Sequence, residues 1–287
     1  MPSDDRTYRP WRERLAVALH LIERRDRQPS SVVVVASTPR TGSTLLCRTL
    51  NRTGVVGELH EALNNRSLLR AARRWGAPKA RPWSLAAHAW RRRRMEDFSD
   101  WYPFSRRSLR RYLFVVGRRR QTPNGVFAFK VHGLQFQKTL HRHGIDLHQW
   151  GVPVTWLRIR RRDRVAQAVS NARALQTTQF IHTQTTRGAA KYDAELIADC
   201  LEQNTLGEAF WDEYLPANGI TPIEVWYEDL AADPTGEFRR VLDALGHPDA
   251  EVPVPATERQ GDSLNREWIE RFRRERPDLV AALETPR

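Results

Sequence analysis

The chain has 287 residues, 40% of them hydrophobic and ten of them tryptophan, which is the composition of a folded protein and excludes a disordered one. Its formal net charge of +13 points to an anionic partner: nucleic acid, an anionic membrane surface, or an anionic substrate or cofactor. The N-terminus has no apolar signal-peptide core, no apolar run reaches membrane-spanning length, and Cys47 and Cys200 have neither metal nor redox spacing. We therefore expect a cytoplasmic protein with no transmembrane segment and two free, buried thiols.

Residues 1–30 form the first predicted unit, an N-terminal helical extension to a single domain over residues 31–287. Apolar side chains recur in it at helical spacing between arginines: Trp11, Leu15, Ala18, Leu19 and Ile22. This spacing predicts an amphipathic helix that covers the domain. A helix that binds a membrane surface or a partner is the alternative.

A strand, a short loop and a helix N-terminus follow. The run Val32–Val35 predicts a central parallel strand buried on both faces, and helical spacing resumes at Ser43. The first N–H groups of a helix lack internal partners and the helix dipole is positive there, so an anionic oxygen can bind. Gly42 lets the backbone approach an anion, we expect Ser43 and Thr44 to add hydroxyls at the N-cap and N1 positions, and Arg40 adds a positive charge.

This loop departs from the nucleotide-binding loop of kinases and NTPases at two positions. That pattern requires a glycine where Ser37 stands and a lysine where Ser43 stands. A kinase is therefore disfavoured, and an ordinary strand-turn-helix of an α/β sheet is the plain alternative.

The loop resembles the phosphosulfate-binding loop of sulfotransferases, which bind 3'-phosphoadenosine 5'-phosphosulfate (PAPS). The similarity continues through Thr53-Gly54-Val55-Val56-Gly57-Glu58 and Glu61, where it is to the bacterial trehalose 2-sulfotransferase family in particular, and it spans roughly residues 31 to 275. The resemblance implies a 5'-phosphosulfate site in the loop, made of Pro39, Arg40, Thr41, Gly42, Ser43 and Thr44.

Two carboxylates lie just after a second predicted strand, Gly54–Gly57. If a helix begins near Gly57, Glu58 and Glu61 are three residues apart on one face and point over the same sheet edge as the loop. A carboxylate there can accept a proton from an attacking hydroxyl. Glutamates at a helix start are also explained by the dipole alone.

A basic insert at about 66–120 carries the excess positive charge of the chain, with sixteen arginines and Lys79 against three acids. Apolar residues at helical intervals, interrupted by prolines, predict two to four short helices. Because the insert follows Glu61 directly, we expect a lid or wall over the acceptor site. Solvated helix faces, or a nucleic-acid or anionic-surface site, are the alternatives.

The next predicted strand, Val126–Val131, ends in Lys130-Val131-His132. Lys130 and His132 are two residues apart and so lie on one side of the strand. Eukaryotic cytosolic sulfotransferases carry a similar pair, and this resemblance implies His132 as the base and Lys130 as assistant to the leaving group. The trehalose 2-sulfotransferase pattern implies Glu61 as the base instead, so the sequence leaves Glu61 and His132 open.

A second anion site is predicted after the strand Val154–Ile159. Arginines at a strand end and Ser170 about two helical turns on can grip one phosphate from two sides. In sulfotransferases such a pair holds the cofactor's 3'-phosphate, which implies Arg161 or Arg162 with Ser170, although spacing does not choose among Arg160, Arg161 and Arg162. Arg259, in a stretch similar to the family's late loop, is a candidate second contact.

The rest of the chain predicts further helices and one strand. We expect a helix over Tyr192–Leu215, a strand over Ile223–Tyr227, a helix over Pro234–Leu245 that ends at Gly246, and a polar helix over Glu267–Leu283. The whole pattern predicts an α/β fold of the P-loop type, a mostly parallel central sheet with helices on both faces. Ligands of such sheets bind at the carboxyl ends of the strands, where the motifs above fall.

The functional hypothesis is sulfuryl transfer from PAPS to a hydroxyl of a carbohydrate, glycolipid or other small-molecule acceptor, without a metal. Its catalytic residues are Arg40, Lys130 and Glu61 or His132. Nucleic acid is not an expected partner, and a homodimer is compatible with the sequence. The alternative from another class is a nucleic-acid or anionic-surface binding protein with a degenerate P-loop.

Overall fold

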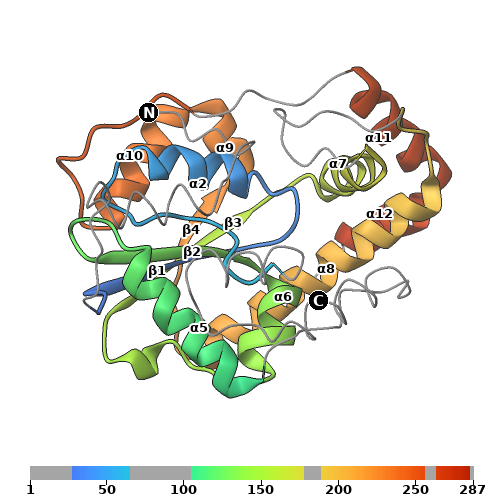
Figure 1. Cartoon of the computed structure of the whole chain (residues 1–287). Coiled ribbons are helices and arrows are strands. Elements are labelled where there is room, and N and C mark those ends of the chain that lie inside the picture. The colour runs from blue at the N-terminus through green and yellow to red at the C-terminus, as the bar shows by residue number, and fades with distance from the viewer. Residues whose placement is uncertain (1–27, 65–104, 178–188, 256–262, 285–287) are drawn as a thin grey trace.

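The computed structural model describes residues 28–64, 105–177, 189–255 and 263–284. In this part of the chain the centre is a fully parallel sheet in the order β2-β1-β3-β4 (Figure 1). Its strands are β1 (Ser31–Ser37), β2 (Val126–His132), β3 (Val154–Arg160) and β4 (Ile223–Trp226). The predicted α/β class and these four predicted strands are confirmed.

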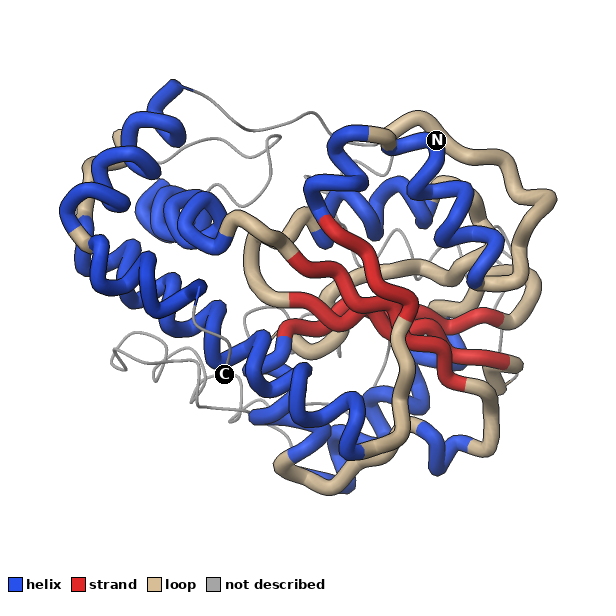
Figure 2. The backbone as a smooth tube through the Cα atoms, turned by 180° about the vertical axis from the view of Figure 1, so that it is seen from behind, coloured by secondary structure: helices blue, strands red, loops and turns tan. Residues whose placement is uncertain are grey.

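Helices cover both faces of the sheet, as Figures 1 and 2 show. One face is covered by α2 (Ser43–Asn51), α9 (Tyr227–Ala232) and α10 (Pro234–Ala244), and the other by α5 (Arg106–Arg119) and α6 (Gly133–Phe136). Short turns, η3 (Gln137–His141) and η4 (His148–Trp150), lead into β3. Val32 and Val34 pack in one core cluster and Val33 and Val35 in the other, so this strand is apolar throughout because both of its faces are buried.

A third group of helices lies beyond the carboxyl ends of the strands. It consists of α7 (Arg164–Thr177), α8 (Ala194–Ala217), α11 (Ser263–Glu275) and α12 (Pro277–Glu284) (Figure 1). They pack around their own core, in which Trp268 and Phe272 contact α7 and α8. Cys47 and Cys200 are buried free thiols, as predicted. None of the described helices combines the length and the apolar character needed to cross a lipid bilayer.

The segment after α2 differs from the prediction. Residues Gly54–Gly57 form turns, not a strand, and no helix begins near Gly57. Both glycines have positive φ, and the Asn51 side chain binds the backbone of Leu59, accepting from its N–H at 2.7 Å and donating to its carbonyl at 3.0 Å. The chain is thereby bent toward β2, where Glu61 pairs with Lys130 in an isolated parallel bridge.

The polar helix predicted over Glu267–Leu283 is two helices. Pro277 has no N–H to continue α11, and instead occupies the first position of α12. Most of the N-terminal extension, the insert up to residue 104, and Arg259 lie outside the described residues.

Candidate active site

The candidate site lies at the carboxyl ends of β1, β2 and β3. Parallel register places Ser37 beside His132 and Ala36 beside Arg158, so the segments that follow these strands meet at one edge. The loop after β1 therefore faces the end of β2 on one side and the start of α7 on the other. This is the edge at which open α/β sheets bind ligands.

The loop between β1 and α2 is tightly turned. Arg40 has φ 64°, and in the described part of the chain no other non-glycine residue has a positive φ. The Thr41 hydroxyl donates to the Thr38 carbonyl at 3.0 Å. Gly42, with φ 85°, is the N-cap of α2, so Ser43 and Thr44 are N1 and N2, one position later than predicted. Strained backbone of this kind persists where a binding geometry requires it.

Gly42 permits a close approach that a larger residue would block. A Cβ atom there would lie 2.5 Å from Cδ2 of Tyr227, whereas at Gly54, with φ 69°, it would meet no atom within 4 Å. We expect Gly54→Ala to lower the free energy of unfolding by about 1 kcal/mol through backbone strain alone, and Gly42→Ala by about 3 kcal/mol. Urea unfolding of both variants measures this, and equal losses would show that the Tyr227 contact is unimportant.

A carboxylate, an ammonium and an imidazole meet beside the loop. Glu61 Oε1 lies 2.8 Å from Lys130 Nζ and 3.7 Å from His132 Nε2, and His132 Nδ1 lies 2.9 Å from the Ser37 hydroxyl. Lys130 and His132 thus point to the same side of β2, as predicted. Glu58 does not join them, because it is exposed and paired with Arg120.

The charges in this cluster stabilise one another. Burial by itself would raise the pKa of Glu61, but the Lys130 ammonium and His132 outweigh it and hold that pKa well below its usual range. Burial likewise opposes the charge of Lys130, yet Glu61 raises its pKa. The Glu61 side chain keeps 27% of its surface exposed, so the ionised group is not sealed inside the protein.

Guanidinium groups gather on the other side of the loop. Arg40 Nε donates to the Ser170 hydroxyl at 2.9 Å, and Arg161 Nη1 donates to the Arg40 carbonyl at 3.3 Å. Burial, and then the positive charges of Arg161 and Arg173, lower the pKa of Arg40. Arginine charges crowded around one serine hydroxyl make this a place where an oxyanion is favoured.

The three consecutive arginines at the carboxyl end of β3, Arg160 to Arg162, have different partners. Arg160 contacts Glu208, and Arg162 forks onto Asp229 with distances of 2.6 and 2.8 Å. Both stack over Trp226, while Arg161 lies over Tyr227, 4.6 Å from its ring centroid. Alternate residues of an extended chain point to opposite sides, so Arg161 is the one turned toward the loop.

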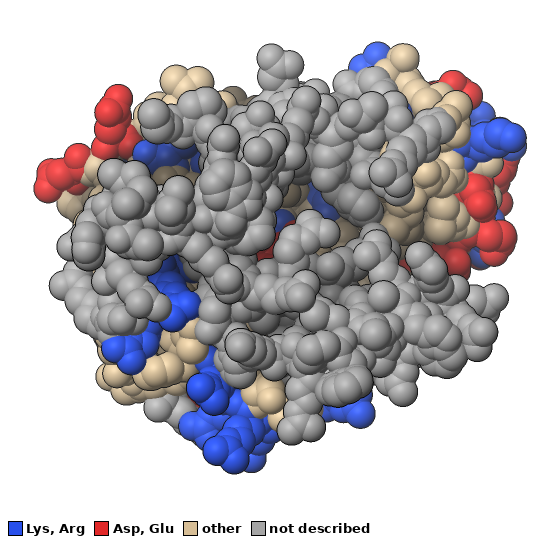
Figure 3. Space-filling view, in the orientation of Figure 1, with Lys and Arg blue, Asp and Glu red and all other residues tan. Residues whose placement is uncertain are grey.

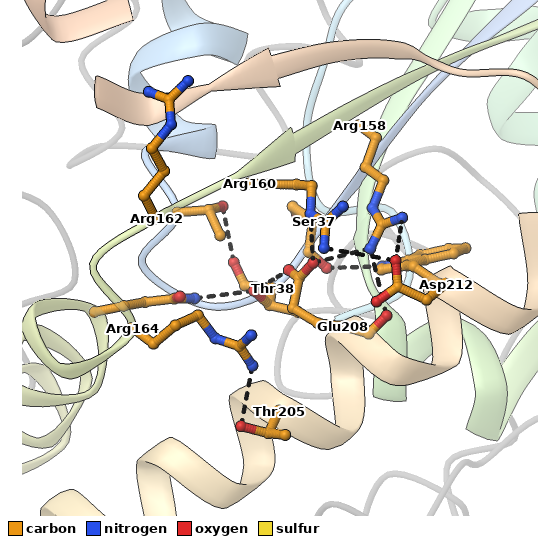
Figure 4. A network of polar contacts seen from close by, with 12 residues as sticks. Ser37, Thr38, Arg158, Arg160, Arg162, Arg164, Thr205, Glu208 and Asp212 are labelled. Atoms are coloured by element: carbon orange, nitrogen blue, oxygen red, sulfur yellow. Dashed lines mark hydrogen bonds and ion pairs between the residues drawn. The ribbon is translucent and has the colours of Figure 1, made fainter. Parts of the chain in front are cut away.

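A buried network behind the loop was missed by the sequence reasoning (Figure 4). Glu208 accepts from Thr38 at 2.8 Å and from Arg158 at 3.0 Å, and Gln167 donates to Thr38 at 2.9 Å. A signal was present in the sequence, since an arginine inside an otherwise apolar strand needs a buried acid partner. The sequence does not say which of the many acids supplies it.

A separate hollow lies away from the candidate site. Its volume is about 780 Å³, and it is lined by Arg106, Arg107, Arg110 and Arg111 of α5 together with Pro29 and Val152. Because Pro29 and Val152 lie two residues before β1 and β3, the hollow is at the amino ends of the strands. Figure 3 shows basic side chains gathered over α5 on this part of the surface. No three His, Cys, Asp or Glu side chains of the described chain form a metal-binding group.

Comparisons with known proteins agree with the loop motif. The family model described as Stf0 sulphotransferase matches residues 31–275. A trehalose 2-sulfotransferase of Mycolicibacterium smegmatis is 33% identical over 266 residues, and one of Mycobacterium tuberculosis is 30% identical over 265 residues. Each alignment covers 86% of this chain and 96% of the relative. The chain has the α/β fold and the strand-loop-helix motif that its sequence predicted. It is an enzyme, and it belongs to the Stf0 sulphotransferase family.

Proposed function

We propose that this enzyme transfers a sulfuryl group from PAPS to a hydroxyl of a carbohydrate, glycolipid or other small-molecule acceptor. The observation that carries the proposal is the contact between Arg40 and Ser170 beside Arg161. It joins the anion-binding segments that follow β1 and β3. A nucleoside with a phosphate on its 3' oxygen and a phosphosulfate on its 5' oxygen needs two such segments close together.

The chemistry of these residues fits that donor. Guanidinium forks, a serine hydroxyl and a helix N-terminus are the groups that bind phosphate and sulfate oxygens in proteins. The backbone and hydroxyls from Pro39 to Thr44 would hold the 5'-phosphosulfate, and Arg161 with Ser170 the 3'-phosphate. Arg162 is already occupied by Asp229, and Arg259 stays a candidate second contact. When bound, the donor supplies the sulfuryl group, and no residue of this chain carries it covalently.

The cluster around Glu61 supplies the proton acceptor. Glu61 takes the proton of the attacking hydroxyl, since its carboxylate is ionised and partly exposed. Lys130 and Arg40 place positive charge where negative charge develops as the bond to the leaving group breaks. His132 is the alternative base, and Ser37 fixes the orientation of its ring.

The acceptor class follows from the relatives. Two proteins at least 30% identical to this chain are named trehalose 2-sulfotransferases, so we propose a carbohydrate hydroxyl and would test trehalose first. A labelled-sulfate screen of cell extracts extends the search to glycolipids. Incorporation into protein or nucleic acid alone would contradict a carbohydrate acceptor.

The donor site is tested by nucleotide preference. We expect calorimetry to show adenosine 3',5'-bisphosphate binding at least about tenfold tighter than AMP, because a second phosphate gains charge-assisted hydrogen bonds. Arg161→Ala should remove most of this preference, and the neighbouring Arg162→Ala should keep it. Equal binding of the two nucleotides by the wild type would overturn the proposal.

A second candidate function is favoured by the exposed arginines of α5, which suit nucleic acid or another anionic surface. It requires salt-dependent binding of DNA or RNA together with no preference for the bisphosphate. The same titrations, repeated with an oligonucleotide at two salt concentrations, separate the two functions.

A further inference from the structure

We propose that Glu208 of α8 is a positioning residue for the loop between β1 and α2, residues 38–42. It acts through the hydroxyl of Thr38. The inference rests on the proposed function, because it concerns how the loop is held ready for an anion. Thr38 immediately precedes Pro39 and Arg40, so its position sets where the loop leaves β1. Glu208 lies on α8, 170 residues after Thr38 in the sequence.

Glu208 uses its two oxygens on two different elements. Oε1 accepts from the Thr38 hydroxyl at 2.8 Å, while Oε2 lies 3.0 Å from Arg158 and 3.3 Å from Arg160. Thr38, Arg158 and Glu208 are exposed by 0%, 4% and 5% respectively. A charge-assisted hydrogen bond that is this well shielded is strong and has a fixed direction.

Helix α7 holds the same point from the other side. Gln167 Nε2 donates to the Thr38 hydroxyl at 2.9 Å and to the Pro39 carbonyl at 2.6 Å. The Thr38 hydroxyl therefore donates once and accepts once. Because both of its bonds end on buried side chains, the first turn of the loop cannot move without breaking them.

Close packing fixes α8 itself against the strand end. A Cβ at Gly207 would lie 2.9 Å from the Thr38 methyl, and one at Gly133 would lie 2.4 Å from the Gly207 carbonyl. Trp211 Nε1 donates to the Ser37 carbonyl at 3.0 Å. The Glu208 carboxylate thus stands on a helix that packs directly against the Thr38 side chain and the backbone of α6, which is what a positioning role requires.

Glu208 also holds two arginines behind the loop. Together with Asp212 it pairs Arg158 and Arg160, so their charges are compensated there. Because the Glu208 carboxylate is shared between these arginines and the Thr38 hydroxyl, its position fixes the strand end and the start of the loop together.

The test compares buried hydroxyl deletions. Thr38→Val removes both bonds while keeping the shape, Thr38→Ser restores the hydroxyl, and Thr139→Val removes an equally buried hydroxyl on η3, away from the site. We expect Thr38→Val to weaken binding of adenosine 3',5'-bisphosphate about tenfold and to speed hydrogen exchange of the loop amides, residues 38–44, about tenfold in the nucleotide-free protein. Thr38→Ser and Thr139→Val should change neither by more than about twofold.

A double variant isolates the role of Glu208. Glu208→Gln cannot hold both arginines, so it should weaken the same binding, and combining it with Thr38→Val should add less than about threefold to the stronger single effect. If Thr38→Val does not fold, Gln167→Met removes two contacts of the same loop residues and carries the same expectations.

The outcomes separate this inference from the proposed function. A wild type that prefers the bisphosphate, with unchanged binding and unchanged loop exchange in Thr38→Val, overturns the role of Glu208 alone. Multiplicative effects in the double variant also overturn it, because Glu208 would then act independently of Thr38. If the wild type does not prefer adenosine 3',5'-bisphosphate to AMP, the proposed function is wrong, and the positioning role that rests on it is wrong as well.

Discussion

Replacing Glu61 with glutamine is expected to lower kcat by about 10²-fold or more and to leave the affinity for adenosine 3',5'-bisphosphate unchanged. The amide keeps the size of the side chain but cannot accept a proton. Glu58→Gln is the matched control, since it removes a carboxylate three residues earlier that pairs with Arg120 outside the cluster. Steady-state kinetics and calorimetry on both variants measure the two quantities separately.

The pH profile distinguishes the two candidate bases. The Lys130 ammonium beside Glu61 keeps the pKa of that carboxyl below its usual range, so the carboxylate form persists as pH falls. With Glu61 as the base, kcat/KM should stay flat down to about pH 5, below which the ordinary glutamate range of about 4.3 begins. Loss of most activity in His132→Ala, with Glu61→Gln close to the wild type, would pass the role to His132.

The parts of this site that depend on local periodicity were predictable. The four-valine run specified a strand buried on both faces, and the two-residue spacing of Lys130 and His132 placed them on one side of β2. The loop followed from the small residues between strand and helix. All three features rest on spacing along a single segment, which the sequence states directly.

The position of Glu61 shows where such reasoning fails. It was expected at the edge of the sheet on a helix that does not exist, and it reaches that edge through a backbone bridge to Lys130. The bend that brings it there depends on the Asn51 side chain holding the backbone of Leu59. A side-chain contact across a turn of this kind leaves no periodic pattern.

Choices among equivalent residues also needed the tertiary structure. Arg161 and Arg162 are adjacent and chemically identical, and only Asp229, from the segment after β4, shows that Arg162 is already paired. Glu208 is likewise one acid among many until α8 is packed against the end of β1. Long-range partners of this kind give chemically identical residues different surroundings, which the sequence alone does not state.

Arg40→Ala is expected to reduce turnover by about 10³-fold while leaving the protein at least as stable as the wild type. The Arg40 guanidinium lies between the loop after β1 and Ser170 of α7, where we propose that the donor binds, so its loss would remove a preorganised hydrogen-bond donor from that site. The pKa of Arg40 is lowered by burial and by Arg161, so the folded state disfavours its charge. Removing the charge therefore removes an unfavourable contribution to the free energy of folding.

Arg40→Gly should be more stable still, because glycine adopts the positive φ of this position without strain. Arg40→Lys keeps the charge but loses the Nε–H that donates to Ser170, and should recover only part of the activity. Thermal unfolding beside kcat measurements tests the pair of expectations, and a variant that is unstable yet nearly fully active would mean that Arg40 serves the fold and not the transfer.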